Sequence, residues 1–194
     1  MKILVAALLG AVALFAWEFV AHMFTPLAEA GLSYLPKESI VSPALTSAIG
    51  AQRGLYIFPT AGLTNESSRQ EKQQAMDQML DQMKTNPSGL LMYRPAGATF
   101  SFGKSLAVQF LTDLVKALVA VSLLAQTRLA TFGGRVAFVV GVGVVGAIAT
   151  NIPYWNWYGF PDAYTAAQIV MEIVGFICAG LVIALVFKPA ATAR

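Results

Sequence analysis

The sequence predicts an all-α membrane protein: a four-helix transmembrane bundle with a small extracytoplasmic α+β cap between spans one and two. Three observations lead to this fold class. The chain of 194 residues is 57% hydrophobic but only 12% charged, whereas soluble domains carry about 25% charged residues. Its apolar residues are concentrated in four stretches, each about as long as a membrane span. One long polar segment lies between the first two stretches.

The four apolar stretches comprise residues 3–23, 106–126, 136–152 and 166–187. A helix needs about 20 apolar residues to cross about 30 Å of hydrocarbon, so the third stretch is the shortest that qualifies. Backbone inside lipid must satisfy its own hydrogen bonds, and each stretch should therefore be a helix. We expect the lipid bilayer to surround this part of the chain.

The distribution of charge predicts how the spans are oriented. If the N-terminus is cytoplasmic, the inner segments carry only basic residues, which are Lys2, Arg128, Arg135, Lys188 and Arg194. Because short loops rich in Lys and Arg stay inside, both termini should be cytoplasmic, and we expect a bacterial cytoplasmic membrane. The isoelectric point of about 9.1 then reflects topology, and no nucleic-acid partner is predicted.

The first span has a competing interpretation as a cleavable signal peptide. Lys2 followed by an apolar run, with Ala28-Glu29-Ala30 further on, has the general form of such a peptide and its cleavage site. The apolar run is longer than a signal core, however, and the tripeptide lies well beyond its end. We therefore favour an uncleaved helix over residues 3–23.

Residues 24–105 should form the extracytoplasmic cap. Residues 53–59 and 89–95 share a layout of glycine, aliphatic residues, an aromatic residue and proline, which predicts two short strands able to pair. Between them, Ser68 and Glu71 form a capping box that begins a helix. The apolar face of this helix comprises Ala75, Met76, Met79, Leu80 and Met83.

The start of the cap is predicted to be irregular, because Pro26, Pro36 and Pro43 limit helix length there. The cap contains few large apolar residues for its size. We therefore expect it to need the membrane helices or a partner to complete its core.

Residues 153–165 are predicted to be an aromatic outer loop between the third and fourth spans. Two prolines enclose its rings, which form the aromatic outer surface Tyr154, Trp155, Trp157 and Tyr158. Such rings commonly form a belt at the depth of the lipid headgroups. The alternative is a platform that grips a lipid, a sugar or a cation.

Motifs for catalysis are absent from the sequence, so an enzyme is not expected. Gly141, Gly143 and Gly146 match the spacing of a dinucleotide-binding loop, but they lie within an apolar stretch with no preceding strand. Small residues at such positions instead allow helices to approach closely. The single Cys178 and single His22 indicate no Cys-rich or His-rich metal site, and no pattern points to a particular cofactor or metal.

Ionisable residues inside the spans are the most informative feature, because a charge near the centre of a span costs at least ~2.5–3.5 kcal/mol on insertion scales. Glu18, Asp113 and Glu172 belong to three different spans, and each is predicted to lie about 8–10 Å below the outer surface. Polar neighbours complete a candidate set of ligand- or ion-binding residues: Glu18, His22, Gln109, Asp113, Lys116, Asn151, Gln168 and Glu172.

Three interpretations of this set remain open. In the structural one, Asp113 pairs with Lys116 at i,i+3, Glu18 pairs with His22, and Glu172 is protonated or paired, which fixes the helix register. In the functional one, an outward-facing polar cavity binds a proton, a cation or the head of a small ligand, since three acids exceed one lysine. In the third, a basic residue of a partner chain completes the cluster.

The arrangement of loops resembles that of claudin-like tetraspan proteins, in topology only, because the cysteine pair of their first outer loop is absent here. The leading hypothesis is a non-catalytic accessory or partner-binding subunit that engages a ligand or partner from the extracytoplasmic side. Its partners would be other membrane-protein chains or further copies of itself. The alternative is a small transporter or channel-like protein that binds a proton or cation at the acidic cluster.

Overall fold

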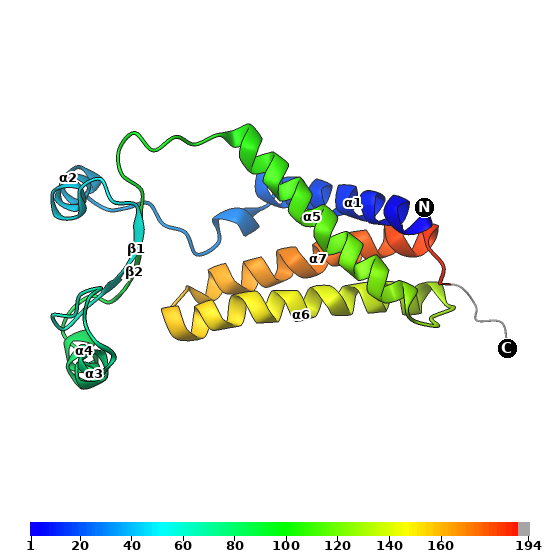
Figure 1. The fold of residues 1–194 in the computed structure, drawn as a ribbon. Coiled ribbons are helices and arrows are strands. Elements are labelled where there is room, and N and C mark those ends of the chain that lie inside the picture. The colour runs from blue at the N-terminus through cyan, green and yellow to red at the C-terminus, as the bar shows by residue number, and fades with distance from the viewer. Residues whose placement is uncertain (190–194) are drawn as a thin grey trace. The chain divides into compact units, whose positions relative to one another are not determined.

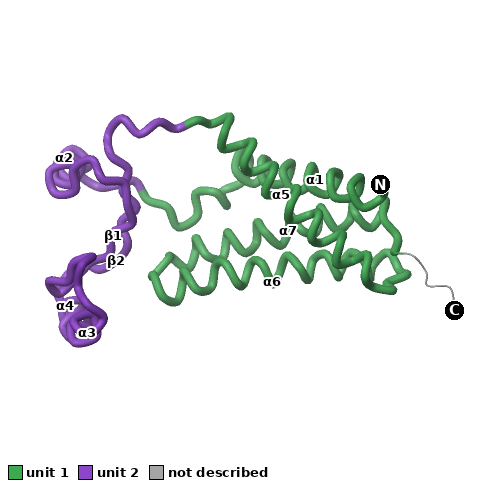
Figure 2. The backbone as a smooth tube through the Cα atoms, in the orientation of Figure 1, with its two compact units in different colours: residues 1–33, 101–194 green, residues 34–100 purple. Residues whose placement is uncertain are grey.

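The computed structural model describes residues 1–189 and is mostly helical (Figure 1). The chain forms two compact units (Figure 2). The helical unit comprises residues 1–33 and 101–189, and the outer unit comprises residues 34–100. The predicted cap of residues 24–105 is therefore trimmed at both ends. In particular, the short 3₁₀ helix η1 (Pro26–Glu29) packs on helices of the helical unit.

Four long helices make up the helical unit: α1 (Lys2–Phe24), α5 (Phe102–Ala125), α6 (Phe132–Tyr158) and α7 (Asp162–Val186). Each is long and apolar enough to cross a membrane by length and composition, which confirms the expectation of four apolar helices. Each contains one of the four predicted stretches almost entirely, and α5, α6 and α7 begin several residues earlier than predicted. The four helices are compatible with an integral membrane protein.

Small residues determine how closely these helices pack. The face of α1 that carries Ala6, Ala7, Gly10 and Ala11 is buried, and α1 packs along both α5 and α7. On the other side of α7 lies α6, where Gly143 meets the ring of the buried Phe176. The helices thus follow the order α5, α1, α7, α6, while α5 and α6 share few contacts. Apolar side chains from all four helices form the core between them.

The predicted aromatic loop is largely helical. Helix α6 continues through Pro153 to Tyr158, and α7 already begins at Asp162, so the loop shrinks to residues 159–161. Proline cannot donate a backbone hydrogen bond and its ring crowds the carbonyl four residues earlier, which kinks or ends many helices, but α6 continues past Pro153. The helix ends instead at Gly159, whose φ of 70° lies in the left-handed region that glycine adopts readily.

Arg135 is buried rather than exposed in an inner loop. It lies in the first turn of α6 and is 3% exposed. Its guanidinium donates hydrogen bonds to the carbonyl oxygens of Ala130, at 2.6 Å, and Ala184, at 3.0 Å. The second bond satisfies a carbonyl in the last turn of α7, where a positive charge is also favoured by the helix dipole. Arg135 therefore ties the beginning of α6 to the end of α7.

The outer unit contains a two-stranded antiparallel sheet and three helices. Strands β1 (Gly54–Phe58) and β2 (Gly89–Tyr93) pair in the register Tyr56 with Leu91, which confirms the prediction that these two segments can pair. Helix α2 (Glu38–Ile49) was not predicted, because Pro43 lies within it. The predicted helix after Ser68 is divided at Ala75 into α3 (Arg69–Gln74) and α4 (Met76–Met83).

The capping box at the beginning of α3 is present as predicted. The Ser68 hydroxyl accepts from the Glu71 amide at 3.2 Å, and the Glu71 carboxylate accepts from the Ser68 amide at 2.6 Å. Hydrogen bonds from the side chain and the backbone amide of Ser68 to the carboxylate favour its ionised form and hold the pKa of Glu71 below its usual value. The contribution of Glu71 to this helix start is therefore complete above the usual pKa of a glutamate and is lost as the pH falls through the lowered value.

The outer unit has almost no core of its own. Among its described residues, only Ala75 and Tyr93 are buried apolar side chains. The Tyr93 hydroxyl donates to the carbonyl oxygen of Gly50 at 2.9 Å, which anchors β2 to the end of α2. One face of the two-stranded sheet, by contrast, exposes Leu55 and Met92, which are directly paired across the strands. A unit of this kind buries too little apolar surface to be stable without further contacts.

Candidate functional site

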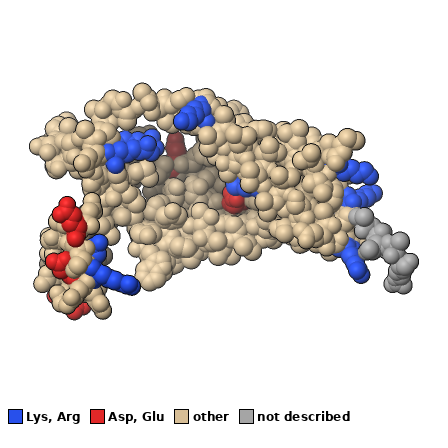
Figure 3. Space-filling model, in the orientation of Figure 1, with Lys and Arg blue, Asp and Glu red and all other residues tan. Residues whose placement is uncertain are grey.

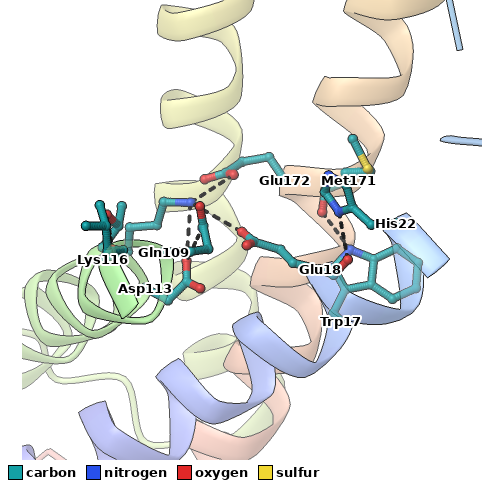
Figure 4. A network of polar contacts seen from close by, with 10 residues as sticks. Trp17, Glu18, His22, Gln109, Asp113, Lys116, Met171 and Glu172 are labelled. Atoms are coloured by element: carbon teal, nitrogen blue, oxygen red, sulfur yellow. Dashed lines mark hydrogen bonds and ion pairs between the residues drawn. The ribbon is translucent and has the colours of Figure 1, made fainter. Parts of the chain in front are cut away.

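Three helices bring four charged side chains together near the middle of the helical unit (Figure 4). Glu18 comes from α1, Asp113 and Lys116 come from α5, and Glu172 comes from α7. Asp113 lies near the midpoint of α5, and Lys116 follows it by one helical turn. We call these four residues the charged cluster.

The ammonium group of Lys116 lies at the centre of the charged cluster. Its Nζ donates a hydrogen bond to Glu172 Oε2 at 3.1 Å. Asp113 Oδ1 lies 3.7 Å away and Glu18 Oε1 lies 3.8 Å away, both within the range of an ion pair. One lysine thus faces three carboxyl groups. The predicted contact between Asp113 and Lys116 is present, but Glu172 is the closest partner of the lysine.

The four charged side chains differ in burial. The side chains of Glu18, Lys116 and Glu172 are 21–27% exposed, whereas that of Asp113 is 0% exposed. Gln109, one turn before Asp113, donates to Asp113 Oδ1 at 3.3 Å. The other oxygen, Asp113 Oδ2, has no hydrogen-bond partner among residues 1–189. Burying a carboxylate oxygen without a hydrogen-bond donor costs free energy. Asp113 is therefore the member of the cluster whose ionised form is least well stabilised by its surroundings.

Three of the predicted site residues do not join the charged cluster. His22 Nδ1 lies 2.8 Å from the backbone carbonyl oxygen of Glu18, not from its carboxyl group. Asn151 donates to the carbonyl oxygen of Ala147 within α6, at 2.9 Å. In the described part of the chain, Gln168 takes part in none of these hydrogen bonds. The expected pair of Glu18 with His22 is thus replaced by the contact of Glu18 with Lys116.

The arrangement does not form a preorganised metal site. Within residues 1–189, no three His, Cys, Asp or Glu side chains converge as metal ligands would. The physical reason is visible in the cluster, where the Lys116 ammonium already occupies the position that the three carboxyl groups face (Figure 4). Chemically, the cluster can hold a proton or exchange ion-pair partners, because three acids compete for one internal cation.

Basic side chains are concentrated at one end of the helical unit. Figure 3 shows a group of them at the end where the N-terminus lies, and a small acidic and basic patch on the surface between the two ends. The opposite end carries charges of both signs, Glu29, Lys104 and Asp162. Lys2, Arg128 and Lys188 are among the basic residues that the charge pattern assigned to one side. Arg194, which was assigned to the same side, lies outside the described residues.

The aromatic residues at the end of α6 mostly contact one another and α7. Trp155 Nε1 donates to Asp162 Oδ1 at 2.6 Å, which joins the end of α6 to the beginning of α7. The Tyr154 ring packs against Tyr158 and Phe160, with centroids 5.8 and 5.3 Å apart. Trp157 is 78% exposed. Only Trp157 therefore presents most of its ring surface outward, as either a belt or a platform would require.

Sequence reasoning missed one polar contact beside the charged cluster. Trp17 Nε1 donates to the backbone carbonyl oxygen of Met171 at 2.8 Å, which joins α1 to α7 next to Glu18 and Glu172 (Figure 4). A tryptophan adjacent to a candidate site residue was the available signal, since a buried indole N–H needs an acceptor. The acceptor itself could not be found from the sequence, because it is a backbone atom of another helix.

Comparisons of this chain with models of protein families, with curated proteins and with solved structures give no match.

Proposed function

We propose that this chain is a non-catalytic integral membrane protein that docks another membrane-protein chain through its outer unit, as an accessory subunit. The observation that carries this proposal is the outer unit itself, whose apolar side chains are largely exposed. In this proposal the four long helices of the helical unit form the transmembrane bundle, both termini are cytoplasmic, and the outer unit lies on the extracytoplasmic side.

The helical surfaces support the membrane part of the proposal. In the apolar windows of the four long helices, only 17–39% of the residues are buried within the chain. Large apolar side chains such as Leu4, Leu111, Val145 and Leu185 are therefore exposed. Apolar surface of this extent is stable in lipid but not in water. The basic end of the helical unit fits the cytoplasmic side of a bilayer.

Cysteine labelling tests this topology. In a Cys178→Ala background, Ser67→Cys and Asn156→Cys should react with a membrane-impermeant thiol reagent added to intact cells, whereas Thr131→Cys should react only after the membrane is opened. Asn156 and Thr131 are exposed on the chain and Ser67 is partly exposed, so access to the reagent should depend mainly on the side of the membrane. Labelling of Thr131→Cys in intact cells, with Ser67→Cys protected, would show the reverse orientation.

The free edge of β1 supports the docking part of the proposal. In the described chain β1 pairs only with β2, so its other edge has no strand partner. A groove of about 740 Å³ lies along this strand, lined by residues 52–57, by the segment after β1, and by Lys72 and Met79 from α3 and α4. An extended segment of another protein can add to such an edge through main-chain hydrogen bonds.

The lining of the groove indicates the chemistry of this partner segment. Leu55 and Ile57 are 64% and 55% exposed and provide apolar contacts. Arg53 and Lys72 place two positive charges in the same lining, and no acidic residue lines the groove. The complementary segment is therefore an extended one with alternating apolar side chains and at least one acidic residue.

Site-specific crosslinking in native membranes tests the docking site. A photo-crosslinking amino acid at position 55 should capture one defined membrane-protein chain, identified by mass spectrometry. Combining Arg53→Glu with Lys72→Glu should reduce this adduct at least about 10-fold, because reversed charges oppose an acidic segment. The matched control, Arg69→Glu with Lys84→Glu, reverses two exposed charges of the same unit outside the groove and should retain the adduct.

Three results would contradict the docking proposal. The first is the absence of any adduct at position 55. The second is an adduct with a further copy of this chain, which would show a homo-oligomer instead of an accessory subunit. The third is an equal loss in the matched control, which would show a general effect of charge on the outer unit.

A further inference from the structure

We propose that the charged cluster is a proton-binding site and that the proton resides on Oδ2 of Asp113. This inference concerns the helical unit and is independent of the docking partner. The ligand is a proton rather than a metal ion, and it is held between α1, α5 and α7.

The charged cluster contains more acidic groups than basic ones. Glu18, Asp113 and Glu172 would together carry three negative charges if all were ionised, and Lys116 supplies one positive charge. The nearby helix surfaces are apolar, so the remaining negative charge has little solvation. Binding a proton removes one of the uncompensated charges without any change in packing.

The geometry identifies Asp113 as the residue that carries this proton. Glu172 has the closest contact with the Lys116 ammonium, at 3.1 Å, so its charge has the nearest counter-charge. The Glu18 side chain is 21% exposed, less buried than that of Asp113. Asp113 is fully buried, 3.7 Å from the ammonium, and its Oδ2 has no donor within residues 1–189. Protonation at Oδ2 neutralises the charge of the buried carboxyl group, while Oδ1 continues to accept from Gln109.

The charged and titratable groups near Asp113 come from α1 and α7 as well as from α5 itself. From α1 come Glu18 and, one turn further on, His22, which faces the backbone of its own helix. From α7 comes Glu172, linked through Lys116. Helix α6 contributes no charge at this level, because its only Arg, Lys, Asp or Glu residue is Arg135 in its first turn. Lys116 is therefore the only cation near Asp113 in the described chain.

The same geometry disfavours a metal ion as the ligand. A cation bound by the three carboxyl groups would have to displace the Lys116 ammonium, which already lies within 3.8 Å of each. Like charges would then be forced together in a poorly solvated site. A proton needs no displacement, because it binds Asp113 Oδ2, a buried carboxyl oxygen with no hydrogen-bond partner among residues 1–189.

Infrared spectroscopy of the purified full chain in lipid nanodiscs tests this assignment. At neutral pH the wild type should show the C=O stretch of a protonated carboxyl group, with the expected downshift in D₂O. Asp113→Asn imitates the neutral acid in shape and should abolish this band while retaining the wild-type melting temperature. The control Asp77→Asn removes an exposed carboxyl group of the outer unit and should leave the band intact.

A second variant keeps the proposal testable if Asp113→Asn does not fold. Gln109→Leu removes the hydrogen bond to Asp113 Oδ1 and should shift the carboxyl band in frequency without abolishing it. No shift in this variant would contradict the assignment to Asp113.

Three results of the infrared and melting experiments would overturn the assignment of the proton to Asp113. The proposal is overturned if the wild type has no protonated-carboxyl band at neutral pH, or if the band survives Asp113→Asn. It is equally overturned if sodium, potassium or calcium abolishes the band and raises the melting temperature of the wild type but not of Asp113→Asn, which would show a cation site. Crosslinking at position 55 should persist in Asp113→Asn, so that failure here is separable from failure of the docking site.

Discussion

Lys116→Met is expected to destabilise the protein by about 3–5 kcal/mol, the typical cost of breaking one side of a buried ion pair. Lys116 is the shared partner of Glu18, Asp113 and Glu172, at 3.8, 3.7 and 3.1 Å. Its removal leaves three carboxyl groups together without a counter-charge. Thermal unfolding of the purified protein in detergent at neutral pH, followed by circular dichroism, measures the loss.

The matched control neutralises the whole cluster. It combines Glu18→Gln, Asp113→Asn, Lys116→Met and Glu172→Gln, which removes the charges together and should restore most of the lost stability. If Asp113 and Lys116 formed an isolated pair, Asp113→Leu with Lys116→Met would suffice. Because Glu18 and Glu172 also face the lysine, we expect that double variant to recover only part of the loss. A Lys116→Met protein as stable as the wild type would refute the central role of the lysine.

Gly143→Ala is expected to destabilise the packing of α6 on α7 by about 1–3 kcal/mol, the usual cost of overpacking a core. A Cβ atom at Gly143 would overlap the Cβ and ring atoms of Phe176. Phe176 is 3% exposed within the core and cannot move aside without disturbing its neighbours. The same thermal unfolding measurement reports the change as a lower melting temperature.

Two glycines of the same helix serve as controls. A Cβ atom at Gly141 or at Gly146 would meet no heavy atom within 4 Å. Gly141→Ala and Gly146→Ala should therefore be neutral or slightly stabilising, since alanine has the higher helix propensity. Equal destabilisation by all three substitutions would show that helix flexibility, and not the contact with Phe176, accounts for the effect.

The sequence by itself determined the elements whose signals are local. Four apolar stretches predicted four long helices because membrane-length helices need a minimum run of apolar residues. The capping box of Ser68 and Glu71 was predictable because both partners lie within one turn. The strands were predictable from short apolar runs bounded by glycine and proline. The presence of Glu18, Asp113 and Glu172 on three different helices also followed from the sequence alone.

The positions of prolines were poor guides to where the helices end. The third span was predicted to stop at residue 152, before Pro153, but α6 continues for five residues beyond this proline to Tyr158. Pro43 likewise lies within α2. A proline removes one backbone hydrogen bond, and whether the helix survives depends on what the flanking turns contact. The sequence around each proline does not contain that information.

Only the tertiary structure decided which polar groups meet. It replaced the expected pair of Glu18 with His22 by a contact of Glu18 with Lys116, and it extended the expected pair of Asp113 with Lys116 to one lysine facing three carboxyl groups. It selected Gly143 among three glycines as the contact with Phe176. Each outcome depends on how far one helix is rotated and shifted against another, which is determined by the packing of side chains from several helices at once. Residue spacing within one helix cannot specify that rotation.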